Sequence, residues 1–340
     1  MRFVPYCAGF TETPEPETRY GEVEEKKAKE KILAVVGPTA GGKSALAMAL
    51  AERLGGEIIS CDSMQVYRRM DIGTAKPTAE EQKKIRHHMI DIVEPDAGFS
   101  CADYVPLAEA AIRDCVARGR VPVVCGGTGL YLDALLRGSD FDPAASDEAL
   151  RRELEALARQ EGALALHARL MQADPESAAA IHPNNVKRVI RALEVYRLCG
   201  VPKSVLDRRS REGEARFDAT VVGLRYPDRE LLYRRIDSRV NQMMEQGLLE
   251  ETRRLSEDGI FEKNRTAAQA IGYKELLGVL RGEEPLAQAV EALKTATRRY
   301  AKRQMTWFGA KSYIQWQDTD GLKKTFEEIV NNTAELFSQT

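Results

Sequence analysis

The sequence lacks the features that mark membrane, secreted and zinc-binding proteins. None of its apolar runs approaches the length of a membrane span, and residues 1–30 contain no apolar stretch typical of a secretory signal. Six cysteines are scattered without a CxxC pair, and the four histidines include one close pair, so no zinc pattern is present. Scattered cysteines are typical of a reducing compartment, and we expect a cytoplasmic protein that does not bind a membrane.

The sequence also lacks internal repeats and a strong charge of either sign. Its formal net charge is −2, so overall charge does not indicate a nucleic-acid-binding protein and local charge must decide. Residues 1–30 are charged and contain prolines, which predicts a disordered N-terminal extension. The length of 340 residues allows one large α/β domain and a smaller one.

The most specific local pattern is GPTAGGKS at residues 37–44. It follows an apolar, β-branched run at 32–36, which predicts a buried strand, and precedes an apolar repeat at 44–54, which predicts a helix. In that context backbone N–H groups and a helix N-terminus bind phosphate groups, Lys43 adds a positive charge, and the Ser44 hydroxyl suits Mg²⁺. By motif alone this is a nucleotide-binding, ATP-binding loop. The predicted polyphosphate site consists of Gly37, Pro38, Thr39, Ala40, Gly41, Gly42, Lys43 and Ser44.

Alternating strand and helix patterns along the chain predict an α/β fold. We expect a P-loop NTPase-like parallel sheet flanked by helices, with right-handed crossovers. Further strands are predicted at 57–63, 87–95, 121–129, 219–226 and 312–318, and helices at 100–118, 228–257, 267–281, 285–308 and 320–338. Residues 142–208 are alanine-rich and without strand patterns, which predicts a small all-helical insertion domain within a catalytic core of 31–141 plus 209–340.

A carboxylate is missing where a P-loop ATPase needs one. The strand pattern at 121–125 ends in Gly126, Gly127 and Thr128, which disfavours an ATPase. The carboxylate that does end a strand is Asp62. Because the carboxyl ends of parallel strands share one edge of a sheet, Asp62, Thr128 and the phosphate loop should converge. We interpret Asp62 as a general base toward a second substrate, with a turn residue as the alternative, and Thr128 as a phosphate-contacting hydroxyl that also suits a helix cap.

Positive charge is concentrated in two segments, although the net charge of the whole chain is slightly negative. Residues 294–311 contain no acid, and their basic residues lie four apart on one predicted helix face, with Tyr300, Trp307 and Phe308 between them. Lys187, Arg188 and Arg191 form a second cluster. Helix faces that only contact solvent usually carry both positive and negative charges. These two basic segments therefore predict binding to a nucleic-acid backbone or a polyphosphate.

Seven motifs in this order resemble those of bacterial tRNA dimethylallyltransferases. They are GPTAGGKS, DSMQVYRRMDIGTAKP (62–77), HHMID (87–91), GGTGLY (126–131), HPNNVKRVIRALEV (182–195), QAIGYKE (269–275) and RRYAKRQMTWF (298–308). The resemblance implies transfer of a dimethylallyl group from dimethylallyl diphosphate to N6 of adenosine 37 in the anticodon stem-loop of tRNAs that read U-initial codons. The loop would then hold a prenyl diphosphate with Mg²⁺ as cofactor, and we expect a monomer.

The resemblance also implies residue roles. Asp62 corresponds to the base, with Thr39, Thr128 and Lys43 at the diphosphate and the reacting centre. The positions that correspond to tRNA contacts are Asp62, Ser63, Met64, Gln65, Thr128, Arg151, Lys187, Arg188, Val189, Ile190, Arg191, Gln269, Ala270, Ile271, Gly272, Tyr273, Lys274, Arg298, Arg299, Lys302, Arg303 and Gln304. Gly309 departs from the family, which often has arginine there, so one positive contact is missing.

Three alternatives remain at this point. An adenylate isopentenyltransferase shares the loop and the aspartate but acts on AMP, ADP or ATP, and it would not need the insertion or the basic C-terminal helix. A small-molecule kinase would turn over ATP and use the insertion as a lid. A tRNA-binding module without catalysis is disfavoured by the intact loop and Asp62.

Overall fold

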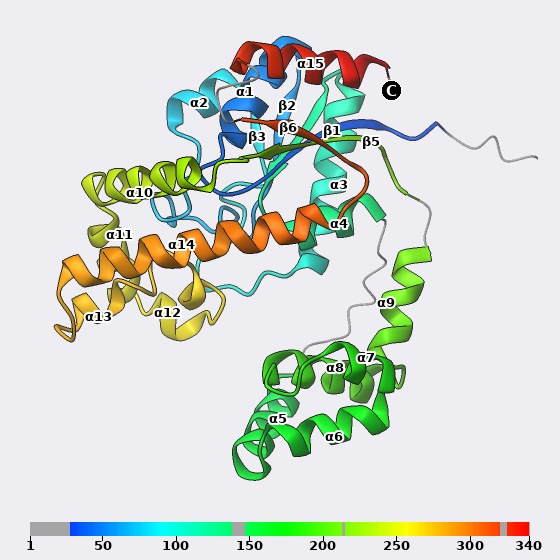
Figure 1. Cartoon of the computed structure of the whole chain (residues 1–340), viewed down its shortest axis with the longest axis vertical. Helices are drawn as coiled ribbons and strands as arrows, with labels where there is room; N and C mark the ends of the chain where they lie inside the picture. Colours follow the sequence, from blue (N-terminus) through cyan, green and yellow to red (C-terminus); the bar gives the residue numbers. More distant parts are fainter. Residues whose placement is uncertain (1–27, 138–146, 213–214, 320–324, 340) are drawn as a thin grey trace, which may run out of the picture.

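The computed structural model describes residues 28–137, 147–212, 215–319 and 325–339. Its centre is a six-stranded sheet in the order β3-β2-β4-β1-β5-β6, in which every paired strand is parallel (Figure 1). The strands are β1 (Lys31–Val36), β2 (Glu57–Cys61), β3 (His87–His88), β4 (Pro122–Gly126), β5 (Asp218–Arg225) and β6 (Ile314–Asp318). The prediction of an α/β fold with a parallel sheet is confirmed. The predicted disorder of residues 1–30 falls almost wholly on 1–27, outside the described residues.

Helices cover both faces of the sheet, which explains why its central strands are apolar on both sides. On one face α1 (Lys43–Leu54) and α15 (Phe326–Gln339) pack over β1 and β4. On the other face α3 (Cys101–Ala117) and α4 (Gly129–Arg137) pack over the same strands. A capping box formed by Ser100 and Asp103 begins α3, in the helix predicted at 100–118.

A second group of helices extends from the carboxyl edge of the sheet. They are α10 (Arg229–Glu245), α11 (Leu248–Glu257), α12 (Ile260–Lys263), the 3₁₀ turn η1 (Ala267–Gln269), α13 (Leu277–Leu280) and α14 (Leu286–Gly309). The short α2 (Ala79–Lys84) lies beside α1, where Lys84 pairs with Glu52. In Figure 1 α10 and α14 run side by side away from the sheet, and their packing brings Ala301 against Leu232 and Ile236.

Three element predictions were wrong in extent. The strand expected at 87–95 is two residues long, because Met89 and Asp91 adopt left-handed φ values of 63° and 55°. The helix expected at 228–257 is divided where Gly247 has a φ of 100°. The helix expected at 267–281 is reduced to η1 and α13, with Gly272 at a φ of 108° between them.

Residues 147–212 contain helices only. These are α5 (Glu148–Glu161), α6 (Ala163–Ala173), α7 (Pro175–Ala180), α8 (Val186–Cys199) and α9 (Lys203–Glu212), which form a separate lobe in Figure 1. The buried side chains of this lobe, among them Leu154, Leu170 and Val189, form a cluster of their own. Within the described part of the chain, no helix is both long and apolar enough to cross a membrane.

Candidate active site

The phosphate loop joins β1 to α1 at the carboxyl edge of the sheet. Gly37 and Gly42 have φ values of 142° and 84°, and a Cβ on Gly37 would lie 2.8 Å from the Leu224 carbonyl oxygen, so this turn requires glycine. The Lys43 ammonium donates a hydrogen bond of 2.7 Å to the Pro38 carbonyl, which folds the side chain over its own loop. Residues 40–45 line an open cleft of about 1420 Å³.

A smaller cavity of about 80 Å³ lies behind the loop. Thr39, Lys43 and Ser44 line it from the loop, Asp62 from the end of β2, and Gly127 from the end of β4. Thr128 stands next to this group, because its Oγ1 accepts a 3.1 Å hydrogen bond from the Ser63 N–H. The convergence expected from the three strand ends is therefore observed.

Asp62 lies in a turn and also faces the cavity. Its Oδ1 accepts hydrogen bonds from the N–H groups of Met64 at 2.9 Å and Gln65 at 3.4 Å, which is the turn geometry considered as the alternative. Both of these bonds use the same carboxylate oxygen. Within the described residues, Oδ2 is thus left for a proton donor in the cavity.

Two cations, Lys43 and Arg239, share the cavity with the Asp62 carboxylate, and a third, Arg235, lies at the larger cleft. Burial, with a smaller contribution from the nearby Arg239, lowers the pKa of Lys43 to about 8 against the opposing effects of Cys125 and Asp62. Burial also lowers the pKa of Arg239. Arg235 donates a 3.0 Å hydrogen bond to the Ala40 carbonyl. A polyanion in the cleft would supply the negative charge that these groups lack.

Arg235 and Arg239 were missed in the sequence. Both lie on α10 four residues apart, and Arg239 lines both cavities. The i, i+4 spacing of two arginines after a strand was the available signal. Asp237 between them concealed it, because the segment mixes charges as an ordinary solvated helix does.

Gln304 connects the loop to the end of β4. Its Oε1 accepts the Thr39 N–H at 2.7 Å, and its Nε2 donates to the Gly127 carbonyl at 3.0 Å. Only 5% of this residue is exposed. Gln304 therefore links the phosphate loop to the end of β4 from inside the site, whereas the family resemblance implied a tRNA contact at this position. We call this linking role a strut.

Comparison with known proteins identifies the family of this chain. Residues 65–311 match the family model described as IPP transferase. The chain belongs to the IPP transferase family. The transferase is similar to the tRNA dimethylallyltransferase of Geobacillus thermodenitrificans, at 50% identity over 289 residues, 85% of this chain and 90% of the relative. That of Caldanaerobacter subterraneus is 45% identical over 308 residues, 90% of this chain and 97% of the relative.

Two solved structures support the same fold. A tRNA isopentenylpyrophosphate transferase from Bacillus halodurans has a TM-score of 0.67 at 45% identity, covering 92% of this chain and 98% of that one. A eukaryotic dimethylallyltransferase acting on tRNA has a TM-score of 0.74 at 30% identity, with 89% and 77% coverage. The resemblance predicted from the seven motifs, the P-loop NTPase-like fold and the prenyltransferase class are confirmed.

The residues implied as tRNA contacts of the transferase differ in accessibility. Lys187 and Arg188 on α8 are exposed, and so are Arg299, Lys302 and Arg303 on α14. Partly exposed arginines already have acidic partners: Arg298 pairs with Asp237, and Arg151 and Arg191 pair with the buried Glu194. The side chains of Val189, Ile190, Ala270, Tyr273 and Gln304 are buried. Any RNA contact must therefore use the exposed members of each segment.

Tyr273 has a structural partner instead. Its hydroxyl donates a 2.7 Å hydrogen bond to Glu251, and the same carboxylate accepts the backbone N–H groups of Asp71, Ile72 and Gly73. Gly73 packs directly against the Tyr273 ring. Tyr273, in the QAIGYKE segment (269–275), thus stabilises the conformation of the MDIGTAKP loop (70–77) through Glu251.

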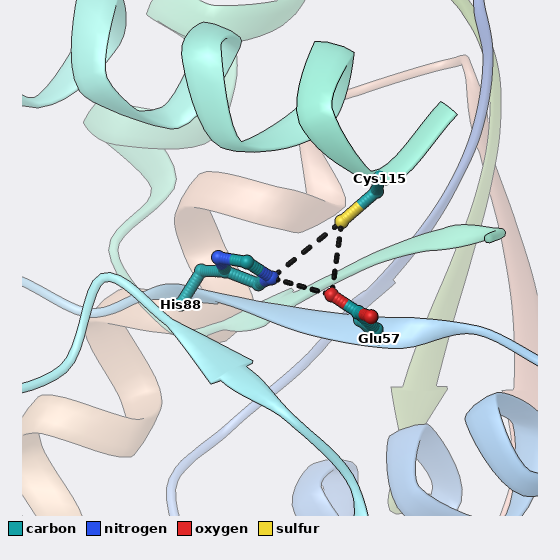
Figure 2. Close-up of side chains that lie close together, drawn as sticks. All are labelled: Glu57, His88 and Cys115. Carbon is teal, nitrogen blue, oxygen red and sulfur yellow. Dashed lines mark hydrogen bonds and ion pairs between the residues drawn. The ribbon is translucent and has the colours of Figure 1, made fainter. Parts of the chain in front are cut away.

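One cluster outside the active site has the residue types of a metal centre. Figure 2 shows Glu57, His88 and Cys115, with 2.7 Å between Glu57 Oε2 and His88 Nε2 and 3.5 Å between Glu57 Oε2 and Cys115 Sγ. Arg118 grips the same carboxylate with two nitrogens, and these hydrogen bonds lower the pKa of Glu57 to about 2. The guanidinium supplies the positive charge that a cation would bring. We therefore interpret the cluster as an ion-pair network that joins β2, β3 and α3.

Proposed function

We propose that the protein transfers a dimethylallyl group from dimethylallyl diphosphate to N6 of adenosine 37 in tRNAs that read U-initial codons. The observation that carries the proposal is a carboxylate, Asp62, in the same cavity as a phosphate-binding lysine, Lys43. The cavity thereby combines a proton acceptor with a site for a diphosphate leaving group. Relatives named tRNA dimethylallyltransferase at 45–50% identity support tRNA as the acceptor.

The donor side stabilises the departing diphosphate. Breaking the allylic C–O bond places negative charge on the diphosphate, and the loop N–H groups, Lys43 and Arg239 are positioned to stabilise it. Since burial makes the Lys43 ammonium costly without a counter-charge, a bound diphosphate raises its pKa again. Thr39, Ala40 and the glycines of the loop bring the backbone close enough for these contacts.

The loop also fits Mg²⁺. The Ser44 hydroxyl lies in the first turn of α1 and lines the cavity next to the phosphate loop. An oxygen group of this kind, completed by phosphate oxygens and water, is what Mg²⁺ prefers. When bound there through Ser44, the ion would neutralise charge on the diphosphate.

The acceptor amine is activated by Asp62. As N6 of the adenine forms its bond to the allylic carbon, the C–O bond to the diphosphate breaks, and the amine proton passes to Asp62 Oδ2. The Thr128 hydroxyl accepts a hydrogen bond from the Ser63 N–H next to this carboxylate, so it would lie close to the reacting centre. An adenine stacked in an anticodon loop must be everted to enter a cavity of this size.

The exposed basic residues grip the tRNA in this proposal. Arg299, Lys302 and Arg303 on α14 and Lys187 and Arg188 on α8 contact the phosphates of the anticodon stem-loop, so the helical insertion is a tRNA-contacting domain. The protein acts as a cytoplasmic monomer.

A labelled-donor assay tests the proposal. Purified protein, Mg²⁺ and labelled dimethylallyl diphosphate are offered unmodified tRNA and, in parallel, AMP and ATP. We expect label in tRNA alone. Asp62→Asn should lower kcat by about 10²- to 10⁴-fold and keep tRNA affinity, whereas Asp96→Asn, an exposed control, should behave as wild type.

Each other outcome rejects the proposal in a different way. Label in the nucleotides alone would identify an adenylate isopentenyltransferase. Consumption of ATP without any transfer of label would identify a kinase. Full turnover by Asp62→Asn would show that another group takes the proton.

A further inference from the structure

Trp307 is an exposed aromatic residue that neither the phosphate site nor the core accounts for. It lies near the end of α14, and 38% of it is exposed. The other tryptophan in the sequence, Trp316 on β6, packs against the core of the sheet. A single exposed apolar side chain is common on protein surfaces, so it is the position of Trp307 beside the active site that indicates a role.

The position of Trp307 follows from the helical repeat of α14. Tyr300, Gln304 and Trp307 are spaced i, i+4 and i+7, so they lie along one side of the helix. Tyr300 lines the small cavity, and Gln304 bonds to Gly127 beside it. Trp307 is therefore the outer member of a row that begins inside the active site.

The Trp307 ring rests on the backbone next to Thr128. A Cβ added to Gly129 would fall within the pyrrole part of the ring, so only glycine permits this contact. Lys311 follows the end of α14, and its ammonium lies over the ring, 5.2 Å from the centroid, where Asp133 accepts a hydrogen bond from it at 2.5 Å. The ring is thus fixed in place while part of it faces solvent.

In the proposed reaction, Trp307 would lie on the side from which the acceptor arrives. The diphosphate occupies the loop, which opens into the large cleft lined by α10. The attacking amine must approach the allylic carbon from the side away from its leaving group, and Asp62 and Thr128 mark that side. Proceeding outward from Thr128, the chain reaches Gly129, under the Trp307 ring, and then the exposed Leu130.

The surrounding charge favours RNA as the occupant. Arg299, Lys302 and Arg303 are exposed on the same helix within eight residues of Trp307. A fixed aromatic ring beside exposed cations is the combination that binds unstacked bases and their phosphates in single-stranded RNA.

We propose that Trp307 stacks against a nucleobase flanking the adenosine that enters the Asp62 cavity. The inference rests on the proposed function, because it takes the acceptor to be the anticodon loop of tRNA. Eversion of one base exposes the faces of its neighbours, and Trp307 would replace the stacking that they lose. The residue would position the acceptor without taking part in the chemistry.

Intrinsic fluorescence of the full-length protein tests the contact directly. Trp316→Phe leaves Trp307 as the sole tryptophan, and Trp307→Phe is the matched control that leaves Trp316. We expect unmodified tRNA to quench the Trp316→Phe protein saturably at the concentration that supports transfer. The Trp307→Phe protein should show no saturable change.

Kinetics separate stacking from a purely structural role. Trp307→Ala should raise KM for tRNA about 10- to 100-fold, the range expected for loss of one base–aromatic stack, with KM for the donor and Tm unchanged. Trp307→Phe should recover most of that loss because it keeps an aromatic face. Equal losses for both substrates, or a matching fall in Tm, would overturn the proposal.

The failure of this inference can be distinguished from failure of the proposed function. If the Trp316→Phe protein transfers the prenyl group but its fluorescence does not respond to tRNA, Trp307 does not stack and the proposed function stands. If the wild-type protein transfers nothing to tRNA, the proposed function and this inference fail together.

Discussion

Replacing Gln304 by methionine should weaken donor binding and leave tRNA binding intact. Methionine keeps the length and approximate volume of the side chain but removes both polar groups. The Thr39 N–H then loses its 2.7 Å acceptor, and the Gly127 carbonyl loses its 3.0 Å donor. No side chain at position 304 would then link the phosphate loop to the end of β4 by hydrogen bonds.

The magnitude follows from the burial of those two groups. A buried polar group without its partner costs about 1–3 kcal/mol. Thr39 is only partly buried, so water can replace one of the two bonds, and a total of about 2–3 kcal/mol is expected. Since about 1.4 kcal/mol corresponds to a factor of ten, KM for dimethylallyl diphosphate should rise roughly 30- to 150-fold.

The assay compares KM for both substrates in two variants of one helix. Gln304→Met should change KM for the donor and not KM for tRNA. Lys302→Ala, two residues away and exposed, is the matched control and should do the reverse. If Gln304→Met instead raises KM for tRNA with donor KM unchanged, Gln304 contacts the RNA, and its assignment as a strut is refuted.

Three further predictions concern other charges in the molecule. The pKa of Lys43 is lowered to about 8, so without a bound donor the Lys43 side chain loses its positive charge as the pH rises through that value. KM for the donor should then rise by about tenfold per pH unit above pH 8 while kcat stays constant, because Lys43 keeps its proton when diphosphate is bound. A KM that does not change with pH up to about pH 9.5 would contradict this prediction. The pKa of Glu57 is lowered to about 2, so its ion pairs stabilise the fold above the usual carboxyl pKa of roughly 4.3 and are lost as the pH falls toward 2. Glu57→Gln should therefore lower the free energy of unfolding at pH 7 by about 2–3 kcal/mol in a denaturant titration and weaken its dependence on acid, and a rise of wild-type Tm on addition of Zn²⁺ would show instead that the cluster binds a metal. The double substitution of Lys187 and Arg188 by alanine should weaken tRNA binding and reduce the slope of log affinity against log salt by about 2, whereas an unchanged slope would remove α8 from the RNA surface.

The phosphate loop, Asp62 and Thr128 could be placed together from the sequence because the rule that joins them is topological. Each follows a strand of a parallel sheet, and the carboxyl ends of such strands meet at one edge whatever the rest of the fold does. The helical character of the segment predicted at 142–208, described from residue 147 onward, was equally accessible, since it depends on local spacing alone. These predictions needed no knowledge of contacts between distant residues.

The predictions that were wrong or incomplete depend on tertiary partners. The helix expected at 267–281 is broken because Gly272 packs against Gly73 and Tyr273 bonds to Glu251, partners far away in the sequence. Gln304 was grouped with the tRNA contacts because its position corresponds to one in the family, and only the packing of α14 against the loop shows that it bonds to Thr39 and Gly127. Local composition does not determine which side of a helix meets the rest of the protein.

The separate hydrophobic cluster of α5 to α8 has a consequence for how the protein loses its structure. A lobe with its own core can melt while the sheet and its clusters stay folded, so heating should produce two calorimetric transitions and a single Tm would not describe the whole chain. A substitution such as Leu170→Ala would then unfold the lobe and abolish modification of tRNA, yet leave dimethylallyl diphosphate bound at full affinity. Loss of activity in variants of this lobe has to be separated from loss of its fold before it is assigned to a missing RNA contact.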